Sequence, residues 1–186
     1  MRGAVIAVVN YDTSSPTGRS MRIVGHDASF GTAADKQPVT LSVDDGSVPN
    51  LLFTVSEKLV AWDMTTRDIA WSSNVAVDTT AVPLGGRLFT RRSDGKLLTL
   101  DAATGATLWD QPVADLKADG TLLTDGRWML AAQVGTGIGL TLVAYALSDG
   151  HRTWETPRPK SIGFVWVFNH QLVGIAADSS TSTVLG

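Results

Sequence analysis

The chain has 186 residues, of which 44% are hydrophobic and 18% are charged, and its formal net charge is −3. This composition is typical of a globular protein with enough apolar residues for a core. Because 18 Asp and Glu outweigh 15 Lys and Arg, general binding to the phosphate backbone of nucleic acids is not expected. The absence of cysteine excludes a disulfide framework, a thiolate zinc site and a cysteine nucleophile.

The first apolar run, Ala4 to Val9, is predicted to be a buried strand. Its six residues are too few to cross a membrane. It also lacks the longer apolar region and the small-residue cleavage site of a signal peptide. We therefore expect no membrane insertion by this chain. A polar loop and a second strand at 21–24 follow, and the weakly patterned residues 28–38 end an incomplete first unit over 1–38.

From residue 39 onward, short apolar segments alternate with turn signals. The segments are rich in Val, Leu, Ile, Thr and Trp, and turns separate them at intervals of roughly 8 to 12 residues. This pattern predicts strands and almost no helix, with four strands in each full unit. The predicted units cover 39–75, 76–113 and 114–160, and an opened unit covers 161–186.

The unit at 76–113 has the clearest turn chemistry. Gly85-Gly86 separates its first two predicted strands, Ser93-Asp94-Gly95 separates the next two, and Ala102 to Gly105 leads to the last. Glycine suits these turns because the hairpin types that match strand twist need positive φ. Short strands and turns alone also fit a sandwich or a barrel.

Three tryptophans indicate a longer period. The spacing is 38 residues from Trp71 to Trp109 and 45 residues from Trp109 to Trp154. Repeats near 40 residues with four strands each are typical of a β-propeller. We therefore predict an all-β fold of four-stranded antiparallel blades, with about four to five blades in this chain.

The residues around these tryptophans resemble a known repeat. Five positions of the unit at 76–113 correspond to the tryptophan-docking motif AxDxxTGxxxW of pyrroloquinoline-quinone (PQQ)-like β-propeller repeats, with Thr99 in place of the usual Ala: Thr99, Asp101, Thr104, Gly105 and Trp109. The preceding unit has Arg67 where Gly is usual and matches at Ala61, Asp63, Thr66 and Trp71. The following unit departs at Ala146 and Asp149 and matches at Ala144, Gly150 and Trp154.

The resemblance implies structural roles for these residues. The tryptophan of each outer strand is expected to pack between neighbouring blades, where its indole N–H needs an acceptor. The Asp and Thr before the Gly are expected to hydrogen-bond the turn. The residues expected to fasten blade to blade are Asp63, Trp71, Asp101, Gly105, Trp109, Gly150 and Trp154.

The number of units raises the question of ring closure. PQQ-like propellers generally close with roughly seven or eight blades. We therefore expect a fragment of a longer propeller. The alternatives are a homodimer that completes the ring and an unusually small ring.

Few residues in the sequence are candidates for binding a cofactor or a metal ion. The resemblance extends to quinoprotein dehydrogenases, which hold PQQ and calcium and typically carry an adjacent cysteine pair, whereas this chain has no cysteine. A calcium site needs several converging oxygen ligands, and Asp-Gly turns explain Asp44, Asp45 and Asp149. We expect no bound cofactor and no metal.

Few residues are candidates for hydrolysis or for phosphate binding. His26, His151 and His170 are isolated in separate units and are interpreted as surface or turn residues. No nucleophile elbow surrounds any serine. The glycine-rich run 135–139 lacks the Lys-Ser/Thr and the helix of a phosphate-binding loop. We expect no enzymatic activity.

Two basic groups and four aromatics remain. Arg91-Arg92, and the group of His151, Arg152, Arg158 and Lys160, are interpreted as solvated strand or connection residues. The alternative is contact with an acidic protein surface, made above all by Arg152, Arg158 and Lys160. Four aromatics lie outside the docking position: Trp62, Trp128, Tyr145 and Trp166. Packing between blades is the first explanation for them, and any of them that is exposed would mark a partner surface.

These observations favour a non-catalytic protein-binding or scaffold module, because propellers present loops on a rigid disc. The resemblance implies a bacterial cell-envelope, extracytoplasmic setting, with the cytoplasm as the alternative. The rival function is a degenerate or partial quinoprotein dehydrogenase. Protein partners are expected, and the sequence does not identify them.

Overall fold

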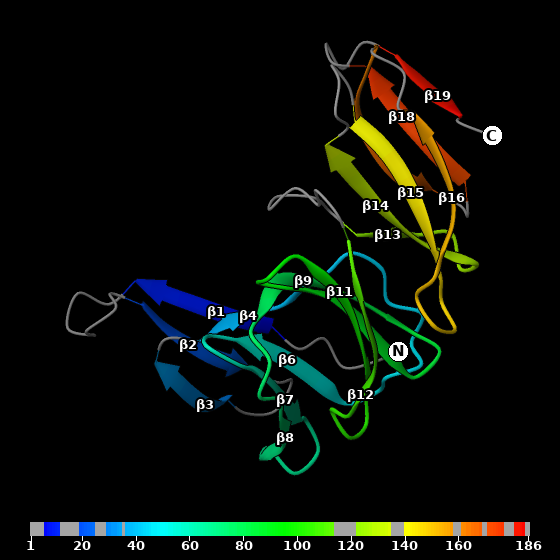
Figure 1. Ribbon diagram of the computed structural model, residues 1–186. Coiled ribbons are helices and arrows are strands. Elements are labelled where there is room, and N and C mark those ends of the chain that lie inside the picture. Colours follow the sequence, from blue (N-terminus) through cyan, green and yellow to red (C-terminus); the bar gives the residue numbers. More distant parts are fainter. Residues whose placement is uncertain are drawn as a thin grey trace.

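The computed structural model describes residues 6–11, 19–24, 29–34, 36–113, 122–134, 140–157, 161–168, 171–176 and 181–184. Within these ranges every regular element is a strand, which confirms the all-β prediction. The same ranges contain no helix long and apolar enough to span a membrane. Five sheets follow one another along the chain, and the first and the last lie at opposite ends of the molecule (Figure 1).

The sheets are numbered in chain order. The first contains β1 (Ile6–Tyr11), β2 (Arg19–Val24) and β3 (Ser29–Ala34). The second contains β4 (Gln37–Pro38), β6 (Leu51–Val55), β7 (Leu59–Asp63) and β8 (Ile69–Ser72). The third contains β9 (Val77–Leu84), β10 (Arg87–Arg92), β11 (Lys96–Asp101) and β12 (Thr107–Pro112), with β5 (Thr40–Leu41) added beside β9.

The last two sheets differ in strand number. The fourth sheet contains β13 (Leu123–Thr124), β14 (Trp128–Val134), β15 (Leu140–Ala146) and β16 (Arg152–Pro157). The fifth contains β17 (Ile162–Phe168), β18 (Gln171–Ala176) and β19 (Ser182–Val184). All pairings between the described strands are antiparallel except the one between β5 and β9.

The segment around residue 40 departs from the sequence-based expectation. The run 39–43 was expected to open the second unit, but Thr40 and Leu41 pair in parallel with β9 of the third sheet. The opening strand of the second sheet is instead β4, which lies at a sheet edge where the missing N–H of Pro38 is tolerated. The weakly patterned residues 28–38 also contain a strand, β3, so the first sheet has three described strands.

One line of directly opposed residues recurs in the sheets, and we call it the docking row. It crosses the last three strands of the second, third and fourth sheets as Phe53–Ala61–Trp71, Phe89–Thr99–Trp109 and Leu130–Ala144–Trp154. Each tryptophan is preceded by a bulge in its strand, a feature that bends the strand and re-aims side chains. In the first sheet the corresponding row is Val8–Arg22–Thr32. A bulge again precedes its last residue, which is Thr32 rather than a tryptophan.

Hydrophobic clusters fill the spaces between successive sheets from the second to the fifth. Between the second and third sheets, Phe53 and Leu59 face Leu88 and Leu98. Between the third and fourth, the buried residues come from both sheets and include Val82, Phe89, Leu97, Met129, Ala131 and Val143. Between the fourth and fifth, Leu123, Leu130 and Ala144 meet Val165 and Leu172. Because side chains alternate across a strand, the third and fourth sheets bury residues on both faces.

Candidate functional site

Trp71 is docked onto the third sheet. Its side chain is 8% exposed, and its indole Nε1 donates to the carbonyl of Ala102 at 2.9 Å. The ring lies against Gly105 of the turn between β11 and β12. Its other neighbour is Phe53 of its own docking row, with ring centroids 5.9 Å apart. The turn of one sheet thus receives the tryptophan of the sheet before it.

Trp109 makes the next joint in the same way, with one difference. Its ring lies against Gly150 of the turn between β15 and β16, and Phe89 is 5.9 Å away between ring centroids. Among the described residues its buried Nε1 has no hydrogen-bond acceptor. The carbonyl that corresponds to Ala102 is that of Leu147, and it accepts from Nη1 of Arg87 at 2.8 Å. The guanidinium has taken the place of the indole N–H.

The receiving glycines have no room for a side chain. Gly105 and Gly150 have φ of 73° and 74°, a region that favours glycine. A Cβ at Gly105 would lie 2.5 Å from Cε3 of Trp71, and one at Gly150 would lie 2.5 Å from Cζ3 of Trp109. At the joint between the first and second sheets, Thr32 holds the tryptophan position and Arg67, with φ of 68°, holds the glycine position. Both partners of that joint are therefore replaced together.

Carboxylates fix these turns. Oδ1 of Asp101 accepts from the hydroxyl and the backbone N–H of Thr104, both at 2.8 Å, and from the N–H of Ala103 at 3.1 Å. The hydroxyl and the backbone N–H of Thr104 lower the pKa of Asp101. Asp63 accepts from the N–H groups of Thr65 and Thr66, and these bonds lower its pKa too.

The fourth sheet shows how the motif tolerates its two departures. Ala146 stands at the Asp position, and Asp149 stands at the Thr position. Oδ1 of Asp149 accepts from the backbone N–H of His151 at 3.1 Å, as the hydroxyl of Thr104 accepts from Ala106 at 3.3 Å. Asp149 also contacts Nδ1 of His151 at 2.6 Å, and the backbone and side chain of His151 lower the pKa of Asp149. Asp149 therefore serves the turn.

The Asp44-Asp45 pair also serves local structure. Asp44 accepts from the N–H of Gly46 at 2.8 Å. Asp45 accepts from Gly85 N–H at 2.8 Å, and Ser47 Oγ accepts from Gly86 N–H at 2.8 Å. Burial opposes ionisation of Asp45, but its bonds with Ser47 and Gly85 lower its pKa overall. The loop before β6 is thereby tied to the first hairpin of the third sheet.

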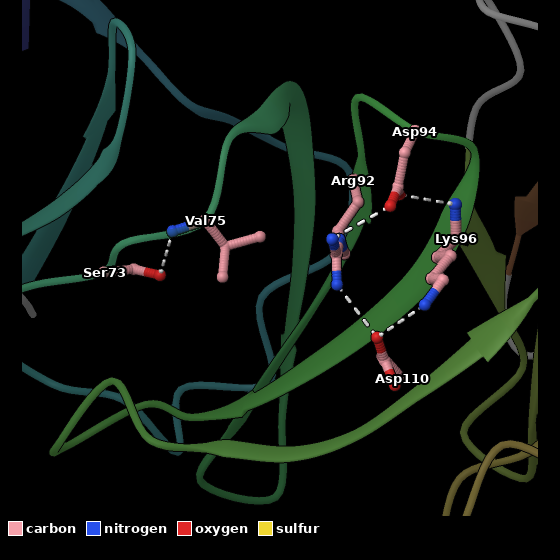
Figure 2. Close-up of polar contacts among 6 residues, drawn as sticks. All are labelled: Ser73, Val75, Arg92, Asp94, Lys96 and Asp110. Atoms are coloured by element: carbon pink, nitrogen blue, oxygen red, sulfur yellow. Dashed lines mark hydrogen bonds and ion pairs between the residues drawn. The ribbon is translucent and has the colours of Figure 1, made fainter.

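Three basic residues on β10 and β11 form ion pairs: Arg91, Arg92 and Lys96. Arg91 is 5% exposed and pairs with Asp78. Figure 2 shows Arg92 between Asp94, at 2.9 Å, and Asp110, at 2.9 Å, with Nζ of Lys96 at 3.2 Å from Asp110. This group closes the end of the β10–β11 hairpin.

Of the three basic residues proposed as partner contacts, the structure describes only Arg152. Arg152 is exposed and pairs with Glu155. Arg158 and Lys160 lie outside the described residues, as do His26, His170 and the glycine-rich run 135–139. Within the described residues, no three or more His, Asp or Glu form a group that could hold a metal ion.

Of the four other aromatics, one is largely exposed. Tyr145 is buried, Trp128 packs in the cluster between the fourth and fifth sheets, and Trp62 donates to Thr54 Oγ1 at 3.0 Å. Trp166 is 56% exposed, and Phe164 and Phe168 beside it on β17 are 58% and 75% exposed. We call these three residues the aromatic stripe.

Sequence reasoning named Trp166 but missed the two phenylalanines. Their spacing of two residues along a strand was the available signal, because it places all three on one face. Alternation does not reveal whether another sheet covers that face.

Replacing Gly105 with Ala should destabilise the protein by about 2–4 kcal/mol, since strain at positive φ adds to overpacking against Trp71. Gly95→Ala is the matched control, because Gly95 has φ of 85° and a Cβ there would have no neighbour within 4 Å. It should lose only about 1 kcal/mol. Denaturant unfolding of both variants measures the difference, and equal losses would contradict the docking geometry.

Replacing Asp101 with Asn should make stability less sensitive to acid. Because the folded pKa of Asp101 is lowered, the contribution of its charge is complete above the unfolded pKa, near 3.9, and disappears as pH falls through the folded pKa. The stability difference between wild type and variant should therefore shrink below about pH 4. Thermal unfolding from neutral to acid pH measures it, and a difference independent of pH would refute the assignment.

Comparisons with known proteins agree with this architecture. A family model described as outer membrane protein assembly factor BamB matches residues 9–163. The quinohemoprotein alcohol dehydrogenase of Comamonas testosteroni is 35% identical over 88 residues, which are 43% of this chain and 12% of that protein. Quinohemoprotein alcohol dehydrogenase ADH-IIG of Pseudomonas putida is 32% identical over 98 residues, which are 50% of this chain and 14% of that protein.

Two solved structures share the fold over almost the whole chain. BamB from Moraxella catarrhalis has a TM-score of 0.62 at 17% identity, over 99% of this chain and 66% of that one. The Cps50 (Swd1) β-propeller domain of Myceliophteria thermophila has a TM-score of 0.62 at 13% identity, over 96% of this chain and 64% of that one. The predictions of a propeller and of a PQQ-like repeat are confirmed. The chain belongs to the PQQ-like repeat family whose model is described as outer membrane protein assembly factor BamB.

Proposed function

We propose that this chain is a non-catalytic protein-binding or scaffold module of a bacterial cell-envelope protein. The observation that carries the proposal is the aromatic stripe on the fifth sheet. Large aromatics gathered on an exposed sheet face are typical of protein interfaces. The exposure of Trp166 fits the expectation that such a residue marks a partner surface.

The position of the stripe in the repeat adds support. Trp166 lies opposite Val173, just as Val82 lies opposite Phe89 and Leu123 opposite Leu130. Val82 is 0% exposed and Leu123 is 7% exposed, whereas Trp166 is 56% exposed. The same position is thus buried in two sheets and exposed among the described residues in the third.

The chemistry of the polar residues supports a binding role over catalysis. The carboxylates of Asp63, Asp101 and Asp149 accept hydrogen bonds from their own turns. Groups committed in this way are poorly placed to act as general acids or bases on a substrate. The exposed chemistry that remains concentrated on one surface is apolar and aromatic, which suits contact with a protein.

The relatives support the cellular setting and supply the rival function. The family description, outer membrane protein assembly factor, supports a role in the cell envelope. The identity to two quinohemoprotein alcohol dehydrogenases favours a partial or degenerate dehydrogenase as the second candidate. This chain spans 12% and 14% of those two proteins, so the similarity concerns repeats within them.

Replacing Trp166 and Phe168 together with Ser should abolish partner capture without unfolding the protein, because exposed substitutions change stability by about 0.5 kcal/mol or less. Leu108→Ser is the matched control, since Leu108 is 47% exposed on β12 outside the stripe. Affinity capture from a bacterial envelope extract, with chemical crosslinking, compares the three proteins. A partner retained by wild type and by Leu108→Ser but lost by the double variant is expected.

Two outcomes would count against the proposal. Capture of the same proteins by all three chains would show that the stripe is not the interface. Alcohol oxidation that depends on added PQQ and calcium would favour the dehydrogenase alternative.

A further inference from the structure

The loop between β5 and β6 contacts two adjacent backbone N–H groups of the third sheet. These belong to Gly85 and Gly86, which form the two-residue turn of the β9–β10 hairpin and have φ of 58° and 73°. Leu84 pairs with Arg87 across this turn, so the two glycine N–H groups lie outside the ladder. Successive N–H groups in a turn of this kind form an anion-binding concavity.

Both N–H groups donate to side chains of that loop. Oδ2 of Asp45 accepts from Gly85 at 2.8 Å, and Oγ of Ser47 accepts from Gly86 at 2.8 Å. The bonded residues are 40 and 39 positions apart in the chain, so the loop reaches the turn from outside the hairpin. The turn therefore binds a carboxylate and a hydroxyl side by side.

The corresponding hairpin of the fourth sheet supplies its own acceptor. There Asp125 lies in the turn, and its Oδ1 accepts from the N–H groups of Arg127 and Trp128 at 2.8 and 2.9 Å. The turn of the third sheet has two glycines instead, and its acceptors come from a distant part of the chain. A Cβ added at Gly85 or Gly86 would have no neighbour within 4 Å, so the turn is open on that side.

The loop is held at its base independently of its tip, which we define as residues 44–47. Before the tip, β5 pairs with β9, and Oγ of Ser42 donates to the carbonyl of Leu122 at 3.0 Å. Within the tip, Asp45 and Ser47 are exposed, so water competes for the hydrogen bonds that they accept. The tip can therefore leave the turn while β5 stays in place.

We propose that the N–H pair of Gly85 and Gly86 is a binding site for an acidic segment of a partner protein, and that the tip is its intramolecular competitor. The segment carries an Asp and, two residues later, a Ser or Thr, as Asp45 is followed by Ser47. Its carboxylate accepts from Gly85, and its hydroxyl accepts from Gly86. The contacts that the tip makes in the structure identify this occupant.

The tethered tip sets the strength that a partner must exceed. A group on a short flexible loop acts at an effective concentration on the order of millimolar. A free carboxylate below that concentration leaves Asp45 bound, whereas a protein segment with further contacts displaces it. The site lies on the third sheet and does not rest on the aromatic stripe, so the two proposals can fail separately.

Removal of the Asp45 side chain tests the site with acetate as the probe. NMR of the whole chain follows the Gly85 and Gly86 amides at constant ionic strength. In Asp45→Ala, acetate should shift the Gly85 amide saturably, with an apparent Kd at least about tenfold lower than in wild type. Asp45→Asn should lie between the two, because its amide oxygen is an uncharged and weaker acceptor. The control Glu57→Ala removes another exposed carboxylate and should behave as wild type.

A peptide distinguishes a protein segment from a small carboxylate. Residues 43–48, VDDGSV, capped at both ends, contain the carboxylate and the hydroxyl. The double variant Asp45→Ala/Ser47→Ala should bind this peptide at least about tenfold more tightly than acetate and shift both glycine amides, because the hydroxyl adds a second hydrogen bond. The same peptide with Asp45→Asn is the matched control, and its affinity should be at least about tenfold lower.

Four results would overturn the proposal. Three are the absence of a saturable Gly85 shift in Asp45→Ala, equal acetate affinities of Asp45→Ala and wild type, and equal affinities of the two peptides. The fourth is peptide binding no tighter than acetate binding, which would assign the site to small carboxylates. The amides of Gly105 and Gly150 report on the tryptophan joints and should not move. If Asp45→Ala disturbs them, the comparison of Asp45→Asn with wild type decides.

Discussion

The packing of a tryptophan ring on a glycine turn of the following sheet is the contact on which this structure depends. A buried tryptophan removes roughly 150–250 Å² from water, and in the second and third sheets that area lies at the seam between neighbours. The contact joins the two sheets, since the ring ends a docking row in one sheet and the glycine lies in the turn before the outer strand of the next. Asp101 holds the turn that presents Gly105, and Asp149 serves the turn that presents Gly150.

The sequence allowed prediction of the sheets and the joints to different degrees. Strand-length apolar segments and turn chemistry predicted strands throughout the second, third and fourth sheets, although the first strand of the second sheet is β4 rather than the predicted run 39–43. The motif predicted packing between neighbouring blades for Trp71 and Trp109. The exchange at Leu147, where Arg87 replaces the indole donor, could not be foreseen. It depends on the distance between two sheets, which no local pattern encodes. The same reason hid the pairing of β5 with β9, because a short apolar run can join either neighbouring sheet.

The division between scaffold and surface explains where function is to be sought. The motif carboxylates accept hydrogen bonds from their turns, and Arg91, Arg92 and Lys96 form ion pairs within the third sheet, so these residues stabilise turns and hairpin ends. The aromatic stripe makes no comparable stabilising contacts among the described residues. The residues that correspond to Trp166 in the third and fourth sheets, Val82 and Leu123, are buried. Sequence alternation located that face but did not show that it is open, because exposure depends on the presence of a neighbouring sheet.

A double-mutant cycle between Trp71 and Gly105 tests the central claim most directly. The unfolding free energies of wild type, Trp71→Ala, Gly105→Ala and the double variant give the coupling between ring and turn. If the ring excludes a side chain from the turn, the methyl group should be less harmful once the ring is gone, with a coupling of about 1–3 kcal/mol. Additive effects, within about 0.5 kcal/mol, would show that the two residues do not act together and would contradict the account.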